Sequence, residues 1–216
     1  MNRNTYYEEL KVAAREIRAR CGLSTPRVRL SDLRKIYKEQ GIKIDLWKTK
    51  LKGLRGAYFC DESGASVMLD AKLPEEPRIF TMAHELKHHL FDRLARNCFE
   101  TIADDDFVEI GAEVFAGELI FPEADFSTWC GRLEIAPGAC SPEDLVRLKR
   151  ETKTTLSYAG LVKRATRLGF APAGSLAGEG GLPPESPDAG GGPPDGSPDG
   201  DGGFPTGSLE GGGEGG

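Results

Sequence analysis

The chain has 216 residues, and its 28 lysines and arginines against 34 acidic residues give a formal net charge of −6. Residues 171–216 hold 17 of the 28 glycines, 8 of the 14 prolines and 8 acidic residues but no Lys or Arg, so residues 1–170 are nearly neutral. No run approaches the roughly 18 apolar residues of a membrane span, and the nearly neutral body gives no general signal for nucleic-acid binding.

The first part of the chain is expected to form two helices and three short strands. Thr5 and Glu8 have the spacing of a capping box, which opens a helix that ends at Gly22. Ser31 opens a shorter helix through about Gln40. Alternating apolar residues then predict the strands Ile42–Trp47, Ala57–Cys60 and Ala65–Asp70, the last two as a hairpin.

The rest of the body is expected to be helical. Pro74 and Pro77 close the strand section, and helices are predicted at Arg78–Leu94 and at Asp106–Phe121, where Pro122 stops the second. A further apolar-periodic segment follows Pro122. Ser141, with proline after it, caps a helix to about Glu151, and Ser157 caps the last helix through Leu168. This order predicts an α+β fold.

The cysteines and the N-terminus indicate a cytoplasmic protein. The segment Met1–Tyr7 lacks the apolar region of a secretory signal. The five cysteines are odd in number, widely spaced and never arranged as C-x-x-C, which favours buried or idle thiols over a disulfide framework or a Cys-ligated zinc. They are Cys21, Cys60, Cys98, Cys130 and Cys140.

The three histidines of the chain lie together in the segment His84-Glu85-Leu86-Lys87-His88-His89. On a helix, His84 and His88 are about 40° apart around the axis and one turn apart along it, so both imidazoles can bind one metal ion, whereas His89 points elsewhere. Glu85 takes the place of the general base in H-E-x-x-H metalloproteases. The motif also occurs by chance, and a surface pair of histidines is the alternative interpretation.

A third ligand is expected from the following helix. Glu109 and Glu113 lie one turn apart and flank its apolar face, so either carboxylate can reach a metal held by a neighbouring helix. Without the histidine motif, these acidic residues have a simpler interpretation, since acids are favoured near a helix N-terminus. The residues alone therefore leave the choice of ligand open.

The two motifs together resemble the ImmA/IrrE family of metallopeptidases. Residues 78–90 (RIFTMAHELKHHL) are similar to the family's F-T-x-A-H-E-x-x-H helix, and residues 109–122 (EIGAEVFAGELIFP) to its E-x-x-A-N-x-F-A-x-x-L-L-x-P helix. The resemblance covers roughly residues 5–169. It implies a gluzincin-like zinc peptidase, with manganese as an alternative metal, in which His84, His88 and Glu109 bind the metal and Glu85 is the catalytic base.

Three departures from the family pattern stand out. Glu113 takes the place of the family's usual Asn, which puts a second carboxylate one turn from the expected ligand. Lys87 replaces the common Gly of H-E-L-G-H, and we expect its side chain to lie on a solvated face. The acidic Gly/Pro tail is foreign to the family. We therefore expect a metallopeptidase core at residues 1–135, a small helical, helix-turn-helix-like lobe at 136–170 and a disordered tail at 171–216.

Members of this family typically cleave a helix-turn-helix transcriptional repressor, so the resemblance implies such a repressor as the substrate and derepression of mobile-element or stress genes as the outcome. The alternatives are a non-proteolytic module with a structural metal, which binds a repressor or DNA through residues 141–170, and a toxin–antitoxin-like interaction protein. An intact Glu85 favours the peptidase. DNA contact is given less weight than a solvated face for the basic residues of this lobe, which are Arg147, Lys149, Arg150, Lys153, Lys163, Arg164 and Arg167.

Overall fold

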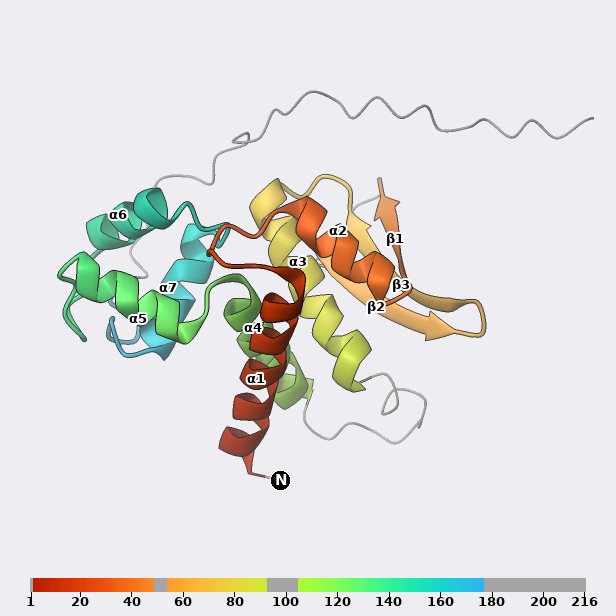
Figure 1. Cartoon of the computed structure of the whole chain (residues 1–216), viewed down its shortest axis with the longest axis horizontal. Coiled ribbons are helices and arrows are strands. Elements are labelled where there is room, and N and C mark those ends of the chain that lie inside the picture. Colours follow the sequence, from red (N-terminus) through yellow and green to blue (C-terminus); the bar gives the residue numbers. More distant parts are fainter. Residues whose placement is uncertain (1, 49–53, 93–104, 177–216) are drawn as a thin grey trace, which may run out of the picture.

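A computed structural model describes residues 2–48, 54–92 and 105–176 and shows an α+β fold (Figure 1). Two helices precede a three-stranded sheet, and helices make up the rest of the described chain. The elements are α1 (Arg3–Cys21), α2 (Leu30–Glu39), β1 (Ile42–Trp47), β2 (Gly56–Asp61), β3 (Gly64–Asp70), α3 (Glu75–Lys87), a π-helical turn (His88–Asp92), α4 (Asp105–Ile120), α5 (Glu123–Arg132), α6 (Pro142–Thr152) and α7 (Tyr158–Arg167).

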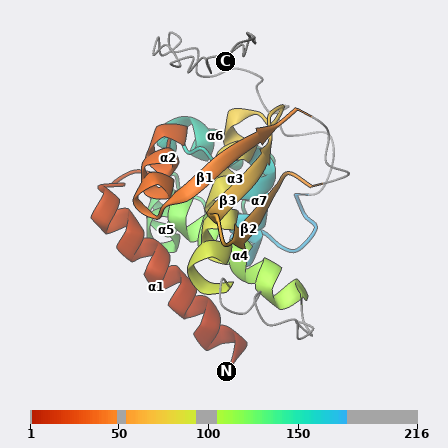
Figure 2. The ribbon, with the colours of Figure 1, turned by 90° about the vertical axis from the view of Figure 1, so that its right-hand side faces the viewer.

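The sheet has the strand order β1-β3-β2. β1 runs parallel to β3, with Ile42 opposite Ala65. β2 runs antiparallel to β3, with Asp61 opposite Gly64, which confirms the predicted hairpin. Along β3, Ala65, Val67 and Leu69 are buried and the residues between them are not, so one face of the sheet packs on the helices. Figure 2 shows the strands on the near side of the molecule with α3 behind them.

Helix α3 is the central element of the fold. It contacts α4 on one side and β2, β3 and α2 on others, and Ile79, Met82, Ala83 and Leu86 on it are buried. The Tyr37 hydroxyl of α2 donates a hydrogen bond to the Met82 carbonyl at 2.7 Å and joins the two helices. A helix enclosed in this way holds its side chains in fixed directions, which is the requirement for a precise site.

Several predicted helix limits are confirmed, and others are corrected. Ser141 and Ser157 cap α6 and α7 as predicted. The capping box at Thr5 is wrong, because Asn2 caps α1 by accepting the Asn4 amide proton, and Thr5 lies inside the helix. Pro77 does not end the strand section but lies in the first turn of α3, where its missing N–H leaves no hydrogen bond unmade.

The predicted helix Arg78–Leu94 changes its form before its end. The α-helix finishes at Lys87, and a π-helical turn runs from His88 to Asp92. The last two residues of that prediction, 93 and 94, lie outside the described residues. Single π-helical turns are rare and occur preferentially at functional sites.

Helices α5, α6 and α7 follow one another beside the core (Figure 1), and α6 and α7 are the helices within residues 136–170, the range of the predicted lobe. The predicted tail falls outside the described residues from 177 onward. Its first six residues are described, and Ala171 and Leu176 among them belong to the hydrophobic core, with 4% and 6% of their surface exposed. The packed body therefore extends at least to Leu176. None of the helices in the described part of the chain is long and apolar enough to cross a membrane.

Candidate metal centre

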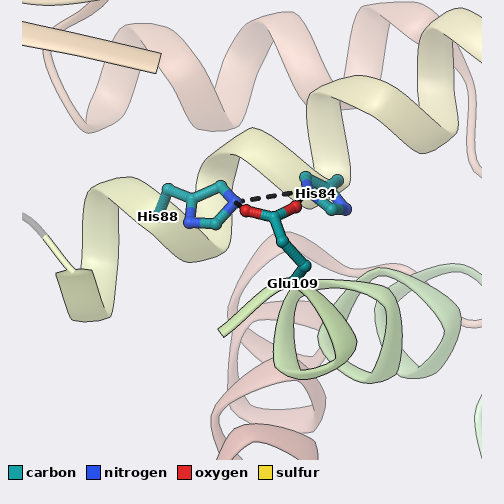
Figure 3. Close-up of side chains that lie close together, drawn as sticks. All are labelled: His84, His88 and Glu109. Carbon is teal, nitrogen blue, oxygen red and sulfur yellow. Dashed lines mark hydrogen bonds and ion pairs between the residues drawn. The ribbon is translucent and has the colours of Figure 1, made fainter. Parts of the chain in front are cut away.

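The two histidines of the motif lie at the junction of α3 and the π-helical turn. His84 is in the last turn of α3, and His88 is the first residue after it. Their side chains leave the same side of the helix, as Figure 3 shows, and the two Nε2 atoms are 3.2 Å apart. The helical spacing therefore brings together the pair of imidazoles that the sequence predicted.

Helix α4 brings a carboxylate to these imidazoles. Glu109 Oε2 is 3.0 Å from His84 Nε2, and Glu109 Oε1 is 3.5 Å from His88 Nε2. The three side chains offer ligand atoms that all lie within 4.8 Å of one another. Among the described residues, this is the one group of His, Cys, Asp or Glu side chains close enough to share a metal ion. His88 is almost fully buried, whereas the Glu109 side chain is 52% exposed, so the site opens to solvent on the α4 side.

The chemistry of these side chains fits a divalent metal. Two imidazole nitrogens and one carboxylate are a common ligand set for catalytic zinc, which leaves a further position for water. The Nδ1 atom of His88 is 2.6 Å from Asp92 Oδ2, and an ionised carboxylate only accepts, so Nδ1 carries the proton. The Nε2 atom of His88 faces His84 and Glu109, and a proton on Nδ1 is the tautomer that metal binding through Nε2 requires.

Asp92 and Lys87 belong to the site, although the sequence analysis did not assign them a role. Lys87 is completely buried, so the expectation of a solvated face is wrong. Its Nζ atom donates to Asp92 Oδ2 at 2.7 Å and to the Val108 carbonyl at 3.0 Å. Burial raises the pKa of the Asp92 carboxyl, but the hydrogen bonds from His88 and Lys87 outweigh it and hold that pKa below its usual value.

The predicted base, Glu85, is buried beside the three candidate ligands. Only 6% of its surface is exposed. It lines the same cleft as His84, His88 and Glu109, together with Tyr58 and other residues of β2. Burial, and next the charge of Glu85, raise the pKa of Tyr37 well above its usual value. A carboxylate therefore lies in the wall of the cleft, next to the ligand cluster.

His89 takes no part in the cluster, as the helical geometry predicted. Its Nδ1 atom is 3.1 Å from the Tyr58 hydroxyl of β2, and the two rings meet edge to face. His89 is 7% exposed and Tyr58 is 3% exposed. The third histidine thus contributes to the packing of the π-helical turn on the sheet.

Glu113 lines the cleft but is engaged elsewhere. Its Oε1 atom is 2.6 Å from Lys163 Nζ, and its Oε2 atom is 3.6 Å from Arg167 Nη2, both on α7. The structure gathers Glu109, and not Glu113, with the histidines. In the sequence, Glu109 stands three residues before Ala112 and so matches the Glu of the family's E-x-x-A pattern, which was the signal that favoured Glu109.

Most of the basic residues in the C-terminal lobe are paired with acids. Arg164 is buried against Glu118 of α4, and Lys149 bonds Glu76 of α3 at 2.8 Å. Four more basic side chains of this lobe lie in ion pairs: Arg147, Arg150, Lys163 and Arg167. Lys163 and Arg167 pair with Glu113 of α4, so they join the lobe to the core as Lys149 and Arg164 do. Arg147 and Arg150 pair with acids of α6 itself. DNA contact through the lobe stays a prediction.

Comparison with known proteins agrees with this geometry. Residues 38–129 match the family model for the IrrE N-terminal-like domain (Peptidase_M78), which confirms the resemblance seen in the motifs. That range contains the candidate ligands and the base. A solved structure of a Mycobacterium tuberculosis transcriptional regulator shares the fold, with a TM-score of 0.55 and 17% identity over 76% of this chain and 50% of that chain. The chain thus spans about half the length of that protein. The comparison of this chain with curated protein sequences found no match.

Proposed function

We propose that this chain, whose residues 38–129 match the model of the IrrE N-terminal-like (Peptidase_M78) domain, is a metal-dependent endopeptidase with a protein substrate. The observation that carries the proposal is the meeting of His84, His88 and Glu109 in a cleft that also contains a buried carboxylate, Glu85. A purely structural metal needs no such acid beside its ligands. The same residues therefore supply both a metal site and a base.

In this mechanism, the imidazoles of His84 and His88 and the carboxylate of Glu109 hold the metal, for which zinc is our first choice and manganese the second. A metal held there supplies Lewis-acid chemistry, which lowers the pKa of a water molecule to about 7 and polarises a peptide carbonyl. Glu85 accepts the proton from the attacking water and returns it to the leaving amine. The open α4 side of the site admits the peptide.

The sheet offers a place for the peptide backbone. β2 is an edge strand of the described sheet, and its residues Gly56, Ala57 and Tyr58 line the cleft. An extended segment can add to such an edge through main-chain hydrogen bonds. A Cβ atom on Gly56 would lie 2.5 Å from Thr81 Cγ2, so glycine lets β2 approach α3 closely at this point.

We assign the substrate to the class of helix-turn-helix transcriptional repressors, whose cleavage would derepress mobile-element or stress genes. The resemblance of the two motifs to the ImmA/IrrE family supports this assignment. The similar solved structure is described as a transcriptional regulator, which agrees with a role in the control of transcription.

The test is Glu85→Gln in the full chain. The amide keeps the shape of the side chain but cannot accept the proton of water, so we expect normal zinc content and a cleavage rate about 10²–10⁴-fold lower. The substrate to use is a helix-turn-helix protein encoded beside this one, with the products identified by mass spectrometry. A wild-type protein that binds this repressor and zinc without cutting it would support the non-proteolytic module instead.

A further inference from the structure

The ammonium group of Lys87 is fully enclosed by protein, at the centre of the fold and next to His88. A charge buried in this way is costly unless it is paired and hydrogen-bonded. Among the described residues, its acceptors include the Asp92 carboxylate and the Val108 carbonyl. The ring of Tyr6 on α1 lies 5.7 Å from the same nitrogen and adds a favourable cation–π contact.

Each of the two acceptors leads to a candidate metal ligand. The Asp92 oxygen that Lys87 contacts is the one that lies 2.6 Å from His88 Nδ1. Val108 is the residue before Glu109 in α4. One ammonium group therefore connects the orientation of an imidazole on the π-helical turn with the backbone that carries the carboxylate ligand.

The π-helical turn explains how Asp92 reaches this place. It starts at His88 and ends at Asp92, and the two side chains are hydrogen-bonded across it. Both side chains are buried, with 2% and 10% of their surfaces exposed. The Asp92 carboxylate thus holds the His88 ring with Nε2 towards the cleft, and Lys87 compensates the charge of that carboxylate.

We propose that Lys87 and Asp92 are positioning residues that join α3, the π-helical turn and α4 into one preformed metal site. The proposal rests on the proposed metal site, and it adds a reason for lysine at position 87, where the family commonly has glycine. Lys87 sets the distance between the two ligand-bearing segments through Val108, and Asp92 sets the direction of the His88 lone pair. Neither side chain touches the metal or the substrate.

The experiment measures the affinity of the metal-free full chain for Zn²⁺ alone, by competition with a chromophoric chelator. Asp92→Ala and Lys87→Met are each expected to weaken zinc binding by about 10–100-fold, the usual effect of removing a partner of a ligand. Lys11→Met is the matched control, since Lys11 also pairs with two acids, Glu8 and Glu123, on an outer surface of α1. Its zinc affinity should equal that of the wild type.

A second variant separates positioning from folding. The double substitution Lys87→Met with Asp92→Leu replaces the buried pair by apolar side chains of similar size, which typically preserves or raises stability. We expect a folded protein with a normal melting temperature that still binds zinc at least tenfold more weakly than the wild type. In the metal-free protein, ¹⁵N shifts of His88 should report Nδ1–H in the wild type and a mixture of tautomers in the double variant.

Zinc affinity within twofold of the wild type in the folded double variant overturns the positioning role and leaves the metal site intact. A wild-type chain that binds no zinc and no manganese overturns the proposed function itself. The two failures are therefore distinguishable in one titration series.

Discussion

The two ends of α4 carry carboxylates with opposite surroundings. Near its C-terminus, Glu118 is fully buried, with Oε1 2.8 Å from Arg15 Nη1, Oε2 hydrogen-bonded to Arg164, and the Glu123 amide donating to Oε2 at 3.1 Å. Near its N-terminus, Glu109 is half exposed and faces the imidazoles of His84 and His88. One helix thus presents a carboxylate neutralised by guanidinium groups and a carboxylate among the nitrogens of the candidate metal site.

This difference separates a structural acid from a functional one. Guanidinium groups at Glu118 neutralise its charge and tie α4 to α1 and α7, so the cluster contributes to folding. At Glu109 the neighbouring groups are the imidazoles of His84 and His88, and the proposed metal ion would complete the group. The difference predicts that substitutions at the two ends will change different measured quantities.

The largest effect is expected at the functional end. His84→Ala, His88→Ala or Glu109→Ala should each reduce the bound zinc to near zero after dialysis, because two remaining ligands hold a catalytic metal poorly. Inductively coupled plasma mass spectrometry measures the metal content. Peptidase activity should fall with it.

His89→Ala is the control for this series. His89 packs against Tyr58 on the sheet, so its removal should lower the stability but leave the zinc content nearly intact. If His89→Ala alone emptied the site, the helical-face argument for His84 and His88 would be wrong.

At the Glu118 end of α4, a substitution should change the stability of the protein. Glu118→Gln leaves the buried guanidinium of Arg164 without its counter-charge, and breaking a buried pair in this way costs about 3–5 kcal/mol. Urea denaturation of the metal-free protein measures the free energy of unfolding. At a temperature at which the variant is still folded, its zinc affinity should stay within twofold of the wild type. A large loss of affinity would show that the two ends of α4 are coupled.

The residues that follow α7 also contribute to the packed core. Leu176 is buried, and fully burying a leucine side chain contributes about 1.5–3 kcal/mol. Truncation after Phe170 should therefore lower the free energy of unfolding by about that amount. Truncation after Leu176 should leave stability and zinc content unchanged. Residues 177–216 are rich in Gly and Pro and have few apolar side chains, so burying them cannot offset the entropy lost on ordering them. If the protein truncated after Leu176 were less stable than the full chain, residues beyond Leu176 would also pack on the body.

Local signals made much of the fold predictable. Ser141 and Ser157 cap their helices because a hydroxyl satisfies a backbone N–H within three residues, and no distant contact is needed. The pair His84 and His88 follows from helical periodicity in the same way. At the N-terminus two local signals competed, and Asn2 caps the helix although Thr5 has the better sequence pattern.

Long-range packing made the rest of the site unpredictable. The burial of Lys87 depends on α1 and α4 closing over it, and its contact with the Val108 carbonyl joins residues that are 21 positions apart. The π-helical turn at His88 has no sequence signature of its own, but Asp92 stands four residues after His88, and this spacing was the signal that could have paired them. Glu113 was ambiguous because its partners Lys163 and Arg167 lie on α7.

The smallest effect is expected at Glu113, between the two ends of α4. Glu113→Gln removes ion pairs with Lys163 and Arg167, whose side chains are 63% and 37% exposed, so the free energy of unfolding should change by less than about 1 kcal/mol. Because Glu113 is held by α7 and not by the histidines, zinc content should stay at the wild-type level. Parallel metal analysis of Glu113→Gln and Glu109→Gln distinguishes the two carboxylates. Loss of zinc from Glu113→Gln, with Glu109→Gln unaffected, would reverse the ligand assignment and place the functional acid one turn further along α4.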